Sequence, residues 1–143
     1  MTASAGIVKH VDRVDRWRDP DTERSVLGDL LLHPDQFAAY RDAGLCADHF
    51  ARQAHRLVMQ AMSELSTKGV TPDMATVRVH LGELGTLDEV GVATLYGLAD
   101  GEPRQPPENV KYRVATLDQL RRCRAVYYSH EKLLAQLHDD PRA

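Results

Sequence analysis

Few residues in this sequence suit a disulfide, a metal site or a membrane. It has only two cysteines, Cys46 and Cys123, which lie far apart and form no Cys-x-x-Cys pair. This spacing argues against a disulfide framework and against a zinc site, so we expect reduced thiols in a cytoplasmic protein. No run of 18 apolar residues is present to cross a bilayer, and residues 1–18 contain no apolar stretch long enough for a secretory signal.

Signals for nucleotides and nucleic acids are also scarce. The sequence contains no Gly-x-x-x-x-Gly-Lys-Ser/Thr phosphate loop, and its length leaves no room for a nucleotide-driven motor domain. Aromatic residues make up 6% of the chain and do not alternate with basic residues as in single-strand binding platforms. The formal net charge of −3 gives no overall attraction to nucleic acid, although a local basic patch is still allowed.

What is present is the composition of a globular protein. Apolar residues make up 43% and charged residues 27% of 143 residues, which is enough for one domain or at most two. A chain of this length buries about 68–70% of its unfolded surface, so its core needs neither disulfides nor metal.

Apolar residues at helical spacing predict an all-α fold. Residues 1–18 lack a sustained period, and we expect a flexible tail there. Residues 19–107 predict a globule of five or six short helices, and Asp19-Pro20 is a typical helix start. The clearest period is that of Ala54, Leu57, Val58, Ala61, Met62 and Leu65, which recur on one helical face.

One long helix is expected over residues 108–143. No glycine or proline interrupts the chain from Pro107 to about His138, so a continuous helix would reach about 45–50 Å. A compact domain of this size has a radius of gyration of about 14–15 Å, so the helix should extend past the globule. Its far half carries apolar residues that a short domain cannot cover, which predicts a partner or a further piece of chain. These candidate interface residues are Val126, Tyr127, Tyr128, Leu133 and Leu134.

The same helix carries a candidate basic patch, Arg121, Arg122 and Arg124. Arginines grouped on one helix can bind phosphate or an acidic protein surface. The alternative is a solvated charged face with local ion pairs.

No arrangement of residues predicts catalysis or metal binding. The seven histidines include no pair at i, i+4 with an intervening Glu, so we expect solvated or structural histidines. Cys46 and Cys123 have no evident base nearby and fall on apolar faces, where we expect them to be small buried residues. Glu23 and Asp73 occur at helix starts, where first-turn or capping roles explain them. We expect the chain by itself not to be an enzyme.

Several short motifs follow one another along the chain at a spacing typical of one protein family. The series opens with Glu-x-x-Val-Leu-Gly at residues 23–28 and continues through Asp-His-Phe at 48–50 and Ala-His-Arg at 54–56 to Val-Gly at 90–91. In this order and spacing the motifs resemble the N-terminal domain of replicative DNA helicases of the DnaB family. The resemblance spans about residues 19–138. The motif residues that carry it are Glu23, Val26, Leu27, Gly28, Phe50, His55, Arg56, Asp73, Gly91 and Asn109.

The resemblance implies an all-α globule that leads into a helical hairpin. In the family, such domains form the N-terminal collar of a hexameric ring and recruit primase or a helicase loader. We therefore expect residues 108–143 to be the first arm of a hairpin whose second arm is missing, and ATP and Mg²⁺ to bind only in a missing motor domain. The expected partners are a second copy of the chain, bound through the long helix, and primase or a loader. We expect DNA to be contacted only indirectly. The expected setting is the cytoplasmic replication machinery of a bacterium or phage.

Two other functions remain open on the residues alone. One is a free-standing adaptor or inhibitor that mimics this domain or the helicase-binding region of primase. The other is a helical nucleic-acid-binding module that uses Arg121, Arg122 and Arg124.

Overall fold

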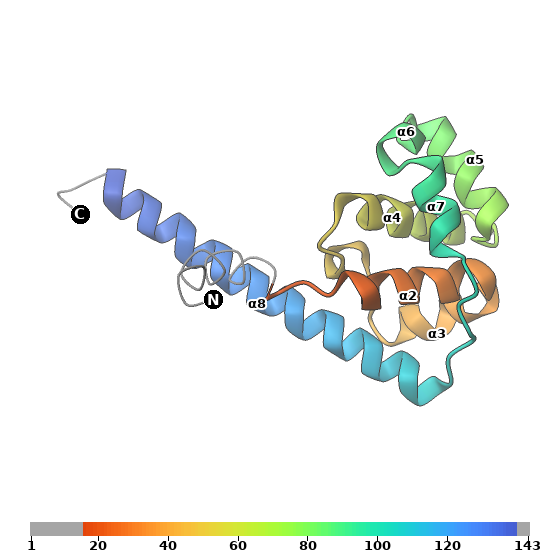
Figure 1. The fold of residues 1–143 in the computed structure, drawn as a ribbon, viewed down its shortest axis with the longest axis horizontal. Coiled ribbons are helices and arrows are strands. Elements are labelled where there is room, and N and C mark those ends of the chain that lie inside the picture. The colour runs from red at the N-terminus through yellow and green to blue at the C-terminus, as the bar shows by residue number, and fades with distance from the viewer. Residues whose placement is uncertain (1–15, 140–143) are drawn as a thin grey trace, which may run out of the picture.

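The predicted all-α fold is confirmed in a computed structural model, which describes residues 16–139. Within that range the regular structure consists of helices, with no β-strand, and six α-helices of up to 15 residues precede one of 33 residues (Figure 1). The elements in chain order are α2 (Pro20–Leu32), η1 (Pro34–Gln36), α3 (Phe37–Asp42), η2 (Ala47–His49), α4 (Gln53–Thr67), α5 (Met74–Leu84), α6 (Leu87–Val90), α7 (Val92–Leu98) and α8 (Pro107–Asp139).

Local side-chain chemistry fixes where the helices begin and end. The Asp19 carboxylate accepts a hydrogen bond from the Thr22 backbone N–H at 3.1 Å and caps α2, while Pro20 occupies its first turn. Asp73 caps α5 in the same way, accepting from the Thr76 N–H at 2.9 Å, which confirms its expected role. Gly85 ends α5 with φ of +75°, a left-handed conformation that favours glycine.

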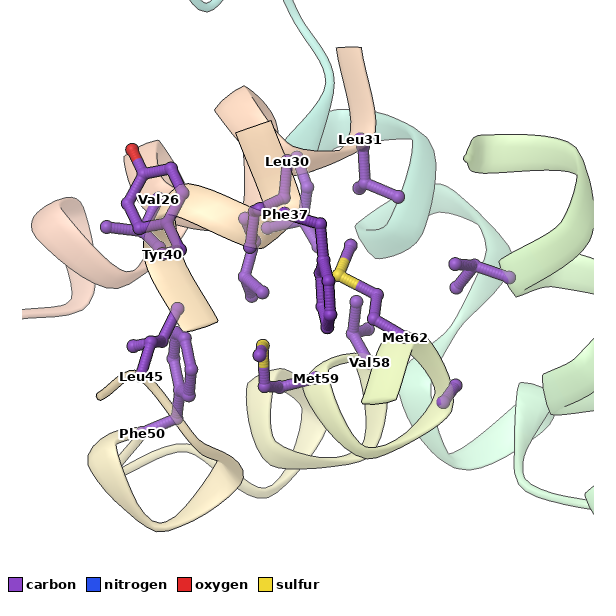
Figure 2. Close-up of a cluster of buried hydrophobic side chains, with 14 of the residues drawn as sticks. Val26, Leu30, Leu31, Phe37, Tyr40, Leu45, Phe50, Val58, Met59 and Met62 are labelled. Carbon is purple, nitrogen blue, oxygen red and sulfur yellow. The ribbon is translucent and has the colours of Figure 1, made fainter. Parts of the chain in front are cut away.

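The core includes buried residues of α2, α3 and α4, to which α5, α6, α7 and the first half of α8 add further buried residues. Figure 2 shows Phe37 of α3 beside Met59, Val58 and Met62 of α4, and Tyr40 of α3 near Val26 of α2. The periodic face predicted over residues 54–65 is the face of α4 that enters this core, and four of its six residues are buried. Burial of such side chains contributes about 1.5–3 kcal/mol each.

Glycine at position 28 allows α2 to lie directly against the segment that follows α7. A Cβ at Gly28 would be 2.3 Å from the Leu98 carbonyl oxygen and 2.5 Å from Cγ of Glu102. Hydrogen bonds also stabilise this contact. The Ser25 hydroxyl donates to the Glu102 carboxylate at 2.8 Å, and Arg113 of α8 donates to the same hydroxyl at 2.9 Å. This network joins α2, the segment before α8 and the first turns of α8.

Glu23 lies in the first turn of α2, as expected, but its side chain does not cap the helix. Its side chain is fully buried and accepts hydrogen bonds from the Ala51 N–H at 2.9 Å and from the His55 ring at 2.8 Å. A buried carboxylate needs such partners, because an unpaired one costs several kcal/mol. Glu23 and His55 therefore join α2 to the start of α4. This also confirms a structural role for one histidine.

Short elements were the least predictable part of the fold. The four-residue helix α6 and the 3₁₀ turns η1 and η2 are too short to show a hydrophobic period, and the sequence did not predict α6 or η2. Figure 1 shows α5, α6 and α7 together at the end of the globule that lies away from α8.

Candidate protein-interaction surface on the long helix

The first half of α8 belongs to the globule. Proline occupies its first position and Glu108 its first turn, both favourable at a helix N-terminus. Val110, Val114 and Leu117 recur on one face and are buried against α2, α3 and η2. This packing fixes the direction in which the rest of α8 leaves the domain.

Arg124 is the last buried residue of α8, with 8% of its surface exposed. Its guanidinium donates to the carbonyl oxygens of Trp17 at 2.6 Å and His49 at 3.2 Å. The expectation that Arg124 belongs to a surface basic patch is therefore wrong. Arg124 lies on the buried face of α8, where an apolar residue would be expected. An arginine is suitable there because the two backbone carbonyls beside it need a hydrogen-bond donor.

The predicted overhang of α8 is also present. From Ala125 to Asp139 every residue is exposed except Tyr127, and Figure 1 shows this half of the helix extending away from the globule. The 15 residues correspond to about 22 Å of helix. The exposed fraction is 70% for Val126, 54% for Leu133 and 47% for Leu134. Leu137, which the candidate list omitted, is exposed to the same extent as Leu134.

Most of these apolar residues share one side of the helix. Pairs seven residues apart place Val126 with Leu133 and Tyr127 with Leu134, and His130 is followed by Leu137 at the same interval. This is the heptad spacing with which two helices pack along a seam. We call residues 126, 127, 130, 133, 134 and 137 the α8 seam.

Tyr128 stands apart from the other candidate interface residues. It precedes Leu137 by nine residues, and at about 100° per residue the two point to opposite sides of the helix. Its ring contacts Tyr127 edge to face, with centroids 5.7 Å apart. Tyr128 is therefore on the back of the α8 seam.

An apolar groove lies at the end of the α8 seam that is nearest the globule. Its volume is about 430 Å³, and it is lined by Trp17, Arg122, Cys123, Val126, Tyr127 and His130. A flexible tail was expected over residues 1–18. Residues 1–15 of that segment lie outside the described residues, whereas Trp17 and Arg18 are described and are half-buried. Trp17 is thus part of the domain.

Arg121 and Arg122, the other two residues of the candidate basic patch, share one carboxylate. Asp118 lies 2.8 Å from Arg121 Nη2 and 2.9 Å from Arg122 Nε, and it accepts a hydrogen bond from His49 Nε2 at 2.9 Å. The Arg121 hydrogen bond and, after it, the His49 hydrogen bond lower the pKa of Asp118 to about 2. The predicted basic patch is therefore reduced to two arginines, whose positive charges are partly compensated by the Asp118 carboxylate.

Of the two cysteines, Cys123 is half-buried, whereas Cys46 does not lie as the sequence suggested. Cys46 is exposed rather than buried, and its Sγ is 3.3 Å from His49 Nδ1, so a base is near it. The Cys46 N–H also donates to that nitrogen at 3.0 Å, and His49 thereby closes the short turn η2. Among residues 16–139 no group of three or more His, Cys, Asp or Glu side chains is arranged to hold a metal ion. None of the helices in that range is long and apolar enough to cross a bilayer.

Comparison with known proteins gives consistent similarities. The sequence model of the family described as "DnaB-like helicase N terminal domain" matches residues 17–118. The replicative DNA helicase DnaB of Treponema pallidum (strain Nichols) is 36% identical over 93 residues, which are 64% of this chain and 20% of that protein. The replicative DNA helicase DnaC of Bacillus subtilis (strain 168) is 30% identical over 93 residues, with the same two shares.

A solved structure is similar over most of the chain. The crystal structure of the N-terminal domain of DnaB helicase from Mycobacterium tuberculosis has a TM-score of 0.75 and 25% identity, covering 88% of this chain and 89% of that one. The chain spans about a fifth of the length of the curated relatives that it matches. The matched family segment ends at Asp118, before the α8 seam begins.

Proposed function

This chain belongs to the DnaB-like helicase N-terminal domain family, and on that premise we propose that it is a non-catalytic, protein-binding domain of a replicative DNA helicase. In this proposal it assembles the collar of a ring by self-association and recruits primase or a helicase loader. ATP and Mg²⁺ would bind to the motor domain of a longer parent protein, and contact with DNA would be indirect.

The observation that carries the proposal is the α8 seam. A helix with apolar residues at heptad spacing and no cover from the described part of its own domain is stabilised by packing against another helix. Leu133, about half exposed, would bury its remaining surface, which stabilises the complex by about 1 kcal/mol. In a symmetric pair the residue occurs twice, so its contribution is about 2 kcal/mol per pair.

The proposal is tested by introducing charge on the seam. Leu133→Asp should raise the dissociation constant of the self-associated form by at least about 30-fold, the equivalent of about 2 kcal/mol. Ala135→Asp is the matched control, because it adds the same charge to an exposed position two residues away that points off the seam. If both variants weakened self-association equally, the effect would come from net charge, and a seam-specific contact would be contradicted.

Recruitment of primase or a loader requires a second measurement. A pull-down with the C-terminal region of the cognate primase, and another with the cognate loader, should retain the wild-type chain. A chain that binds neither partner would contradict the recruitment half of the proposal while leaving self-association standing.

Direct DNA binding is the weaker candidate. Asp118 pairs with both Arg121 and Arg122, and Arg124 is buried, so little free positive charge is left on this part of α8. Salt-dependent binding of single-stranded DNA that is lost in an Arg121→Ala/Arg122→Ala variant would favour the DNA-binding function instead.

A further inference from the structure

The groove at Trp17 offers a binding place distinct from the end of α8. It is formed by one residue near the N-terminus and five residues of α8, and its lining is mostly apolar. Apolar groups that line a groove favour an apolar occupant, because both surfaces then leave water.

The described chain begins at this groove. The Trp17 carbonyl is held by the buried Arg124 guanidinium at 2.6 Å, and the guanidinium carbon of Arg16 lies 5.2 Å from the centre of the Trp17 ring. Residues that precede Arg16 are therefore tethered at the groove. A short tether of this kind gives an effective concentration in the millimolar range, which a free partner does not reach in dilute solution.

The preceding residues have suitable chemistry and reach. Ile7, Val8, Val11 and Val14 are the branched apolar residues of this segment, which otherwise consists of small, polar and charged residues. Ten residues span up to about 33–36 Å when extended and about 15 Å as a helix. Either length exceeds the stretch of α8 that lines the groove, because Arg122 and His130 are eight residues or about 12 Å apart along the helix.

We propose that residues 7–14 of this chain dock in the groove formed by Trp17 and α8. The docked segment covers Val126 and Tyr127 and leaves the outer part of the α8 seam, Leu133 to Leu137, open. Because Val126 and Tyr127 also belong to the seam, the segment competes with self-association there. This last consequence rests on the proposed function, whereas the docking itself does not.

The test uses Trp17, which is the single tryptophan of the chain. The full-length wild type is compared with Val11→Asp/Val14→Asp and with a control, Thr2→Asp/Ser4→Asp, which adds the same charge at positions without branched apolar side chains. Both variants lie outside residues 17–118, the segment matched to the family, and circular dichroism melting checks that the domain is folded. Tryptophan emission and acrylamide quenching are measured at several protein concentrations.

Docking predicts a red-shifted emission and stronger quenching in Val11→Asp/Val14→Asp at every concentration, and wild-type values in the control. Identical spectra for the wild type and Val11→Asp/Val14→Asp would overturn the proposal. Shielding of Trp17 that grows with protein concentration would also overturn it, because a second copy would then fill the groove. A wild type that stays monomeric yet shields Trp17 would contradict the proposed self-association and support docking.

Discussion

Replacement of Gly28 by alanine tests the close approach of α2 to the segment that follows α7. The new Cβ would lie 2.3 Å from the Leu98 carbonyl oxygen, so α2 and the segment after α7 must move apart. Such overpacking costs about 1–3 kcal/mol, while alanine in place of a helical glycine gains about 1 kcal/mol. The separation also stretches the Ser25–Glu102 hydrogen bond. We expect a net loss of about 1–2 kcal/mol in the free energy of unfolding.

The assay is urea denaturation followed by far-ultraviolet circular dichroism, with thermal melting as a second measure. Gly82→Ala is the matched control, since Gly82 is also helical but a Cβ there meets nothing within 4 Å. We expect Gly82→Ala to stabilise the domain by about 1 kcal/mol, or about 3 °C in Tm. A Gly28→Ala protein at least as stable as the wild type would refute the close packing of α2.

Three further substitutions test other parts of the structure. Glu23→Ala leaves the buried His55 ring and the partly buried Ala51 N–H without an acceptor and should cost about 3 kcal/mol in urea denaturation; a loss below 1 kcal/mol would contradict the buried pair. Arg124→Ala should release Trp17 and red-shift its emission, and an unchanged spectrum would count against that anchor. Because Arg121 and His49 lower the pKa of Asp118 to about 2, below about 3.9 in the unfolded chain, its stabilising contribution is present above pH 4 and lost as the pH falls towards 2. Asp118→Asn should flatten this part of the Tm–pH profile, and an unchanged slope would exclude the pairing.

Long helices with a clear period could be predicted from the sequence. The spacing from Ala54 to Leu65 predicts α4, and the absence of glycine and proline between Pro107 and about His138 predicts α8. The overhang of α8 followed from its length alone, because a compact globule of this size is shorter than such a helix. The presence of exposed apolar residues on the far half of α8 could therefore be predicted as well.

Polar tertiary contacts could not be predicted in this way. Arg124 is surrounded in sequence by other arginines, and nothing local shows that the carbonyls of Trp17 and His49 lie beside it. Glu23 has the position of a first-turn carboxylate, yet its partner His55 is 32 residues away. Both contacts depend on how helices distant in sequence pack together.

The approximate location of the candidate surface was predicted, but not which residues share a side. Spacing alone placed Tyr128 with its neighbours, whereas the helix turns it away from Leu137. The groove at Trp17 had no sequence signal, because a single tryptophan next to an acidic helix start matches no motif.

The central claim is that the α8 seam joins copies of this chain. It is tested most directly by sedimentation equilibrium of the isolated chain, whose mass is 16.0 kDa, over a range of micromolar concentrations. We predict a weight-average mass that rises above the monomer with concentration in the wild type and in Ala135→Asp, and stays at 16.0 kDa in Leu133→Asp. A wild type that remains at 16.0 kDa at every concentration would contradict the claim.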